Sequence, residues 1–88
     1  MDQTVMVHRR VSERRPEFSD ADVLTAWENR IRCQIRIGPW PPQYLAIGFD
    51  GKGRSLQMVA TYDPMADEVL IFHAMRATKA VKSELNLE

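Results

Sequence analysis

The alternation of apolar and polar positions is clearest in the middle of the chain. From Ile31 to Ile37 an apolar residue stands at every second position, with charged or polar residues between. This spacing predicts a half-buried antiparallel strand. Its inner face is expected to carry Ile31, Cys33, Ile35 and Ile37. Its outer face is expected to carry Arg32, Gln34 and Arg36.

Three more strands are predicted after this one, each bounded by glycine or proline turns. The proline-rich segment 38–42 ends the first strand, because proline cannot donate to a sheet ladder. The later strands are expected at residues 44–49, 54–62 and 68–74, joined by turns at 50–53 and 63–67. Four strands in chain order with short turns predict an antiparallel meander.

A helix is predicted to begin at Asp20, after a capping box with a hydrophobic staple. The residues of this signal are Phe18, Ser19, Asp22 and Val23. An apolar face then recurs at helical spacing, formed by Val23, Leu24, Trp27 and Ile31. We expect Trp27 to be buried between this helix and the sheet.

Both ends of the chain also carry helix signals. Residues 4–15 are interpreted as a helix ending near Arg14, because Pro16 disfavours helical geometry before it; the alternative is a short strand over Thr4–Val7, which is rich in β-branched residues. At the other end, Thr78 is expected to cap a helix over residues 79–87. The pattern predicts one α+β domain over residues 1–88, a two-layer fold with helices on one face of the four-stranded sheet.

Composition narrows the classes of protein that fit. Of the 88 residues, 44% are hydrophobic and 27% are charged, which is typical of a globular domain. Twelve basic residues balance twelve acidic ones, so any binding of nucleic acid must rest on a local basic patch. Cys33 is a single cysteine, expected to lie unreactive in the core of a protein from a reducing compartment. No run of residues has the length of a membrane span, and a cytoplasmic location is expected.

The candidate chemistry lies in the segment 71–79, where an apolar strand leads into three basic residues. His73 can transfer a proton, while Arg76 and Lys79 can neutralise a phosphate. This combination suits a phosphodiester substrate; the alternative is a packed or surface imidazole. Arg15 and Arg32 are candidate supporting phosphate contacts. No metal ligands occur at paired spacing, and no metal or other cofactor is expected.

Trp40 lies in the proline-rich loop and has two interpretations. An exposed Trp40 could stack on a base or contact a partner protein, and a folded-back Trp40 would cover the core. The glycines near Lys52 are interpreted as turn residues, because the spacing of a phosphate-binding loop is absent.

Nearly the whole chain resembles a group of small toxin-like proteins of actinobacteria. The resemblance rests on three segments: residues 15–29, 47–54 and 71–75. More distantly the layout is similar to the BrnT-type toxins of the RelE-like superfamily, small ribonucleases that a partner antitoxin neutralises. Their pattern ends in a strand with a Ser-Ala-Arg-Arg-Ala-Thr-like motif and a basic helix.

Carried over by position, Ala74 and the run Arg76-Ala77-Thr78 match that motif, and Glu84 lies where a helix acid is expected. His73 stands where the motif has Ser, and Met75 replaces its first Arg. Arg15-Pro16 replaces a turn that holds a functional His in those toxins. The resemblance implies a RelE-like fold and an RNA-cleaving toxin of a type II toxin–antitoxin system, with an antitoxin and RNA or a ribosome as partners. The alternative is a catalytically silent protein-binding module with the same fold, and a homo-oligomer is compatible with either.

Overall fold

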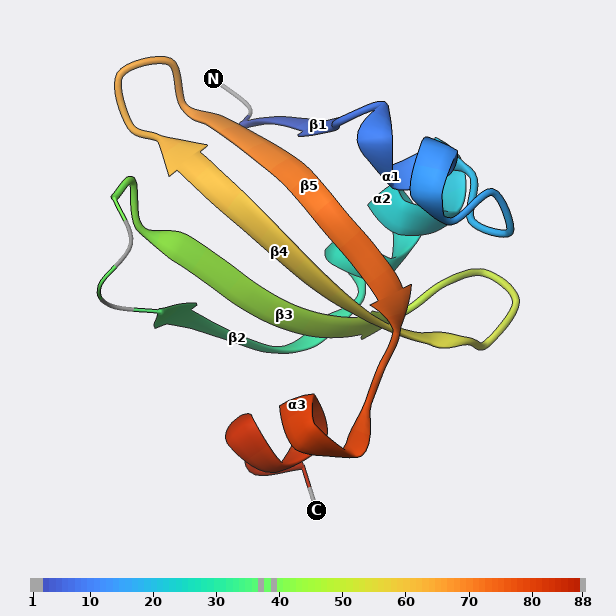
Figure 1. Ribbon diagram of the computed structural model, residues 1–88. Helices are drawn as coiled ribbons and strands as arrows, with labels where there is room; N and C mark the ends of the chain where they lie inside the picture. The colour runs from blue at the N-terminus through green and yellow to red at the C-terminus, as the bar shows by residue number, and fades with distance from the viewer. Residues whose placement is uncertain (1–2, 37, 39, 88) are drawn as a thin grey trace.

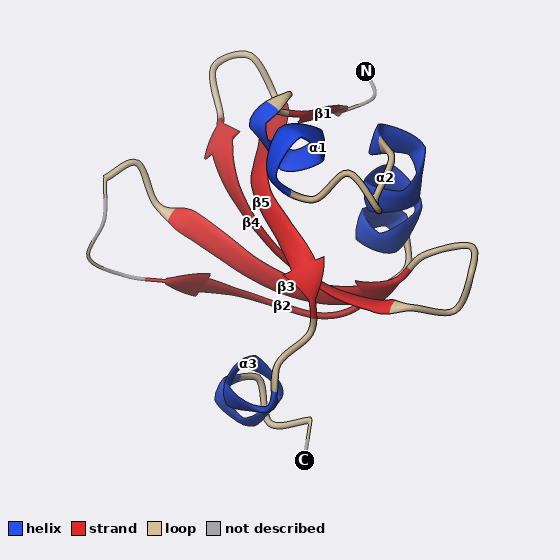
Figure 2. Ribbon diagram, turned by 45° about the vertical axis from the view of Figure 1, so that its right-hand side comes forward, coloured by secondary structure: helices blue, strands red, loops and turns tan. Residues whose placement is uncertain are grey.

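The computed structural model describes residues 3–36, 38 and 40–87, which form one mixed sheet and three helices. In chain order the elements are β1 (Thr4–Val7), α1 (Arg10–Arg14), α2 (Asp20–Glu28), β2 (Arg30–Arg36), β3 (Gln43–Phe49), β4 (Ser55–Asp63), β5 (Glu68–Arg76) and α3 (Lys79–Glu84). The strand order is β1-β5-β4-β3-β2 (Figure 1). The helices α1 and α2 lie on one face and α3 on the other (Figure 2). The α+β class is confirmed, while the arrangement with helices on one face only is wrong.

The first strand corrects the prediction of four strands and of a long N-terminal helix. β1 runs parallel to β5, with Thr4 opposite Glu68 and Val7 opposite Ile71. The strands β2 to β5 pair antiparallel in chain order, so the sheet has five strands and is mixed. The alternative strand over Thr4–Val7 is confirmed, and only Arg10–Arg14 is helical. The β-branched residues of β1 gain both a ladder on β5 and apolar contacts with the core.

The helix α2 begins as its capping signal predicts. The Ser19 backbone N–H donates to Asp22 Oδ2 at 3.0 Å, and the Asp22 N–H donates to Ser19 Oγ at 3.1 Å. Phe18 and Val23 are buried. Trp27 is also buried, which confirms the prediction that it lies between α2 and the sheet. Together with apolar side chains of the sheet they form the main core.

Gly48 lets α2 approach β3 closely. A Cβ atom at this position would lie 1.9 Å from the carbonyl oxygen of Ala26, so no other residue fits without moving the helix. Ala26 itself is fully buried. The close approach fixes the distance between α2 and the end of the sheet where the β3–β4 hairpin begins.

The predicted burial of β2 is wrong. Cys33 is exposed, and the exposed fractions of Ile31 and Ile35 are 46% and 50%. β2 is an edge strand, and α2 packs on β1, β3 and β4 without covering it. A β-bulge between Arg30 and Arg32 also places Ile31 on the α3 side, whereas Cys33 pairs with Ala46 on the other face. Ile37, predicted on the same inner face, lies outside the described residues.

The last helix closes the second face of the sheet. Thr78 Oγ1 accepts a hydrogen bond from the Val81 N–H at 3.3 Å, which confirms the predicted cap. The side chain of Gln57 in β4 accepts from both the N–H and the hydroxyl of Thr78, at 2.9 and 3.0 Å, and so fixes where α3 begins. The helix ends at Glu84, earlier than predicted, and buries Val81 against the α3 side of the sheet.

Candidate functional site

A hollow of about 240 Å³ lies between α1 and the edge of β5. β1 pairs with β5 only as far as Ile71, so beyond that residue the edge of β5 faces α1. The lining residues are Arg10, Val11, Arg14, Arg15, Phe72, His73 and Ala74. The site therefore joins a basic helix to the strand that carries the predicted catalytic histidine.

Local irregularity in β5 positions the imidazole. Val59 of β4 pairs with His73, while the next residue, Ala60, pairs with Ile71, so Phe72 is an extra residue in β5. A bulge of this kind changes the direction of neighbouring side chains. Phe72 packs against the apolar cluster on the α3 side, and the pairing of His73 with Val59 of the same cluster places the His73 side chain on that face as well. Residues 72–74 together form the β5 wall of the hollow.

The helix α1 presents its arginines to the hollow because it is anchored on its other side. Val11 is buried in the main core and holds α1 against β5. Arg10 and Arg14 are four residues apart and so lie on one side of the helix. Arg15, the C-cap residue, completes the group.

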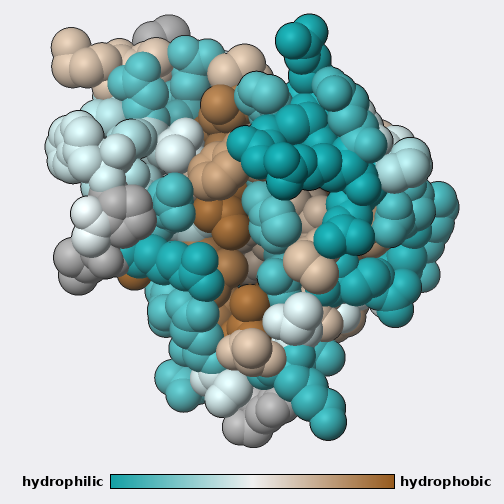
Figure 3. All heavy atoms as spheres, viewed as in Figure 1, coloured by the Kyte–Doolittle hydropathy of each residue, from teal (hydrophilic) through white to brown (hydrophobic). Residues whose placement is uncertain are grey.

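The cations of the hollow are not neutralised by acidic side chains. Within the part of the chain that the structure describes, no ion pair within 4.0 Å involves Arg10, Arg14 or Arg15, and no acid lines the hollow. Arg9, on the outer side of α1, pairs with Glu13 at 3.8 Å in an exposed contact. Figure 3 shows hydrophilic side chains gathered beside a strip of apolar ones over the sheet. This arrangement is chemically suited to an anionic ligand.

The surroundings of His73 favour its neutral form. Burial lowers the pKa of His73 below its ordinary value of 6.5, and the positive charges of Arg15, Arg10 and Arg14, with Arg36 last, lower it further. A neutral imidazole accepts a proton at neutral pH, which is what a general base requires. A bound anion would offset the arginine charges and favour the protonated form.

Two predicted site residues, Arg76 and Lys79, do not line the hollow. Arg76 is the last residue of β5, opposite Leu56, and is exposed. It stands three positions along the strand from His73, which is a distance of about 10 Å between Cα atoms. Lys79 is the first residue of α3 and is also exposed. Of the predicted phosphate contacts, the structure brings only Arg15 to His73.

The other two predicted contacts are remote from His73. Arg32 lies on β2, three strand spacings or about 14 Å from β5. Trp40 is 89% exposed, in the loop between β2 and β3. It borders a separate apolar hollow of about 260 Å³, whose other lining residues are Ile35, Pro41, Pro42, Tyr44, Tyr62 and Pro64. The two residues therefore belong to another surface.

Sequence reasoning missed Arg10 and Arg14 as members of the site. The available signal was the density of arginine, since four of the seven residues from 9 to 15 are Arg. The long helix predicted for residues 4–15 hid their orientation. The chain turns at His8, whose N–H donates to the Ile71 carbonyl at 2.8 Å. This turn brings α1 against the C-terminal half of β5.

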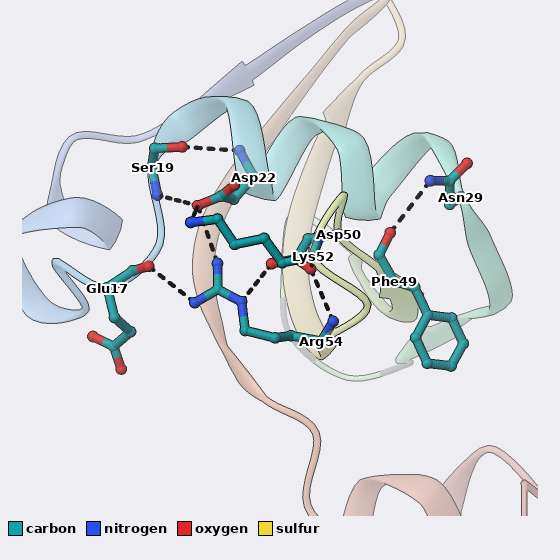
Figure 4. Close-up of polar contacts among 8 residues, drawn as sticks. All are labelled: Glu17, Ser19, Asp22, Asn29, Phe49, Asp50, Lys52 and Arg54. Atoms are coloured by element: carbon teal, nitrogen blue, oxygen red, sulfur yellow. Dashed lines mark hydrogen bonds and ion pairs between the residues drawn. The ribbon is translucent and has the colours of Figure 1, made fainter.

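A second charged cluster, centred on Arg54, is structural (Figure 4). The Arg54 guanidinium donates to Asp50 at 2.7 Å, to Asp22 at 3.1 Å and to the Glu17 carbonyl at 3.1 Å. It also lies 4.6 Å above the ring of Phe18. Each of its three guanidinium nitrogens donates to the protein, and the cluster ties the β3–β4 hairpin to the start of α2.

The carboxylates of this cluster stay ionised. Burial raises the pKa of Asp50, but hydrogen bonds from the Arg54 backbone and side chain and from the Lys52 N–H lower it to below its ordinary value. The Ser19 N–H is the main cause that lowers the pKa of Asp22, with Lys52 and Arg54 adding to it. The negative charges are therefore already matched within the fold.

The described residues contain neither a metal-binding cluster nor a membrane-spanning helix. No group of three or more His, Cys, Asp or Glu is placed to hold a metal ion in residues 3–36, 38 and 40–87. No helix in the same residues is long and apolar enough to cross a bilayer.

Comparison with known proteins gives no relative from which to infer a role. No family model matches the chain, and neither a curated protein nor a solved structure is similar to it. The resemblance to BrnT-type and RelE-like toxins stays a prediction.

Proposed function

We propose that this chain is a toxin-like RNA-binding module that cleaves a phosphodiester bond in the hollow between α1 and β5. One observation carries the proposal: three arginines without acidic partners in the described residues line one hollow together with a histidine whose pKa burial and their charges lower. Arginine binds phosphate through paired N–H donors, and the neutral imidazole supplies the base that attack by a hydroxyl requires.

The proposed reaction is transesterification within RNA. His73 removes the proton from a ribose 2′-hydroxyl, and the oxygen attacks the adjacent phosphorus. The bond from phosphorus to the 5′-oxygen breaks, and the protonated imidazole returns its proton to that oxygen. The products are a 2′,3′-cyclic phosphate and a 5′-hydroxyl. Arg10, Arg14 and Arg15 stabilise the negative charge that gathers on the phosphoryl oxygens.

Of the other predicted site residues, two are assigned a role in binding RNA and two are not. Arg76 ends β5 and Lys79 begins α3, and both are proposed to contact neighbouring phosphates as the RNA continues beyond the hollow. Arg32 and Trp40 have no role in the proposed reaction, because they lie toward the β2 edge of the sheet, away from β5. A net charge of zero is compatible with RNA binding, since the positive field is local to α1.

The biological setting follows from the resemblance and is part of the proposal. A ribonuclease of this kind acts in the cytoplasm on free or ribosome-bound RNA, and a cognate antitoxin would hold it inactive. The hollow is open to solvent on the side of α1 and β5, so an acidic segment of such a partner would compete with RNA for the same arginines.

The decisive experiment separates binding from cleavage. The wild-type chain is incubated with a fluorescent single-stranded RNA, and with the same oligonucleotide carrying 2′-O-methyl groups, which binds but cannot form the nucleophile. We expect cleavage of the first only. His73→Ala should slow cleavage by roughly 10²- to 10⁴-fold and leave binding in place. Arg14→Gln should weaken binding of both oligonucleotides.

The matched control is Arg9→Gln, which removes an arginine of the same helix that faces away from the hollow. It should bind and cleave like the wild type. Cleavage unchanged in His73→Ala would contradict the proposed base. Absence of both binding and cleavage, with and without ribosomes, would contradict the RNA function.

A second candidate function is supported by a different observation. The 89% exposure of Trp40 beside an apolar hollow is typical of a protein-binding surface. A catalytically silent binding module would retain this surface and lose no function in His73→Ala. The same RNA assay therefore decides between the two candidates.

A further inference from the structure

Among the described residues, the outer backbone edge of β2 pairs with no other strand. The strand pairs with β3 on one side only, and all backbone hydrogen bonds of residues 31–36 that the structure describes go to β3. Every residue of β2 is exposed except Arg36, which is half-buried. Natural sheets usually shorten, charge or cover such an edge. A seven-residue strand left bare is thus a place where another chain can add a strand.

The two faces of this edge differ in chemistry. On the helix side, Cys33 pairs with Ala46 and Ile35 with Tyr44. Two adjacent apolar hollows lie there, of about 170 and 260 Å³, and they share Tyr44 and Tyr62. On this side an added strand would meet aromatic and aliphatic side chains.

On the α3 side the edge is basic. Arg32 and Arg36 lie on this face, opposite Ile47 and Gln43. Arg36 binds Glu84 of α3 through two contacts, at 3.0 and 3.2 Å. Arg32 has no ion pair within the described part of the chain, and its guanidinium contacts the carbonyl of its own neighbour, Ile31, at 3.3 Å. The strand contains three arginines and no acid.

We propose that β2 binds an extended acidic segment of a partner protein as a sixth strand of the sheet. Side chains of an added strand alternate between the faces, so acidic residues would lie beside Arg32 while apolar residues enter the hollow beside Ile35. The backbone pairing supplies affinity, and the alternation of acidic and apolar residues supplies specificity. This inference does not depend on the proposed RNA site, which lies on β5, near the opposite edge of the sheet from β2.

The charges of the strand favour a partner over a second copy of this chain. Pairing β2 with β2 would place the arginines of both copies in one ladder without an acid, and like charges across a ladder are destabilising. Arg32, which has no ion pair in the described residues, is the arginine of this face that an acidic strand would meet. Charge therefore selects the occupant of the edge.

The test uses the whole chain and a defined probe. An acetylated eight-residue peptide of alternating Glu and Val is titrated into the ¹⁵N-labelled protein, and amide chemical shifts are followed by NMR. We expect changes in β2 and at the Trp40 indole, and slower alkylation of Cys33 when the peptide is bound. A peptide of alternating Lys and Val, and one with N-methyl groups on alternate residues of the pairing edge, should produce none of these changes.

Two variants distinguish charge selection from unspecific contact. Arg32→Glu should weaken binding of the Glu-Val peptide by at least about fivefold. Arg9→Glu makes the same change of charge on α1 and should leave peptide binding unchanged. Unshifted β2 amides at millimolar peptide, equal binding of the Lys-Val peptide, or dimers formed through β2 in sedimentation would each overturn the proposal. RNA cleavage by Arg32→Glu at the wild-type rate would show that the two surfaces act separately.

Discussion

Arg54 and the arginines of the α1 region have opposite surroundings in this small protein. The guanidinium of Arg54 is directed at two carboxylates, a carbonyl and an aromatic ring, all within the fold. The arginines of α1 line an open hollow in which the structure places no acid. The first group stabilises the protein, and the second is available to a ligand.

The difference explains how a chain with no net charge can hold a basic site. Asp22 and Asp50 are paired with Arg54 at the start of α2, and neither lines the hollow beside α1. What remains near His73 is an excess of positive charge. The distribution of the acids, and not their number, decides where an anion can bind.

The largest expected effect is on stability, at Arg54. In Arg54→Ala the buried carboxylate of Asp50 loses its side-chain partner, and breaking a buried pair in this way costs about 3 kcal/mol. For a domain of this size the midpoint of thermal unfolding should fall by roughly 12 °C or more. The control is Arg10→Ala, which has no ion pair to lose and should stay within about 0.5 kcal/mol of the wild type. Equal losses in the two variants would remove the distinction between the groups.

The next effect is the response to an anion. Inorganic pyrophosphate at ten times its dissociation constant should stabilise the wild type by about 1.4 kcal/mol, because it binds only the folded α1 site. Differential scanning fluorimetry would show a rise of roughly 6 to 11 °C. The rise should vanish in the double variant of Arg10→Gln with Arg14→Gln and persist in Arg54→Ala. An undiminished rise in the double variant would place the anion elsewhere.

The exposed ion pair of Arg36 and Glu84 should contribute less to stability than the buried contacts of Arg54. Arg36 and Glu84 join β2 to α3 through a two-contact pair, and both side chains are 38% exposed. Arg36→Gln should therefore cost less than about 1 kcal/mol in urea unfolding. High salt should remove most of that difference, because the pair is screened by solvent ions. A loss comparable to that of Arg54→Ala would mean that exposure is a poor guide to the role of arginine here.

The smallest effect concerns the pKa of His73. Removing the charge of Arg15 favours the protonated imidazole, so Arg15→Gln should raise the pKa of His73, which burial still keeps below 6.5. Since the base must be neutral, the acid limb of the cleavage rate should move to higher pH with it. NMR titration of the imidazole protons measures the shift, and Arg9→Gln should show none. A lower pKa in Arg15→Gln would contradict the assigned cause.

The parts of the fold that follow from neighbouring residues could be predicted from the sequence. The capping box of Ser19 and Asp22 is complete within four residues, and the cap of Thr78 is equally local. The turn at residues 50–53 and the burial of Trp27 follow from short patterns as well. Such interactions join residues that the chain already holds close together, so they do not depend on the rest of the fold.

The exposure of β2 shows what the alternation of apolar and polar residues cannot predict. Alternation correctly indicates a strand, but it cannot say whether a helix covers the apolar side. Ile35 and Cys33 lie on the helix face of the sheet and are exposed, because α2 packs mainly on β1, β3 and β4 and meets β2 at its first residue, Arg30. The strand order of the sheet decides which strand is left at the edge, and that order is a long-range property.

The sequence by itself determined the helix caps, the turns, the strand alternation and the basic character of residues 9–15. The tertiary structure alone decided that β1 pairs with β5 and that α1 then covers the free part of the β5 edge. His73 and Arg15 are 58 residues apart, and they meet only through this pairing. The physical reason is that a site built between distant segments forms only when the whole sheet is assembled, whereas a cap or a turn is stabilised by residues within one turn of the chain.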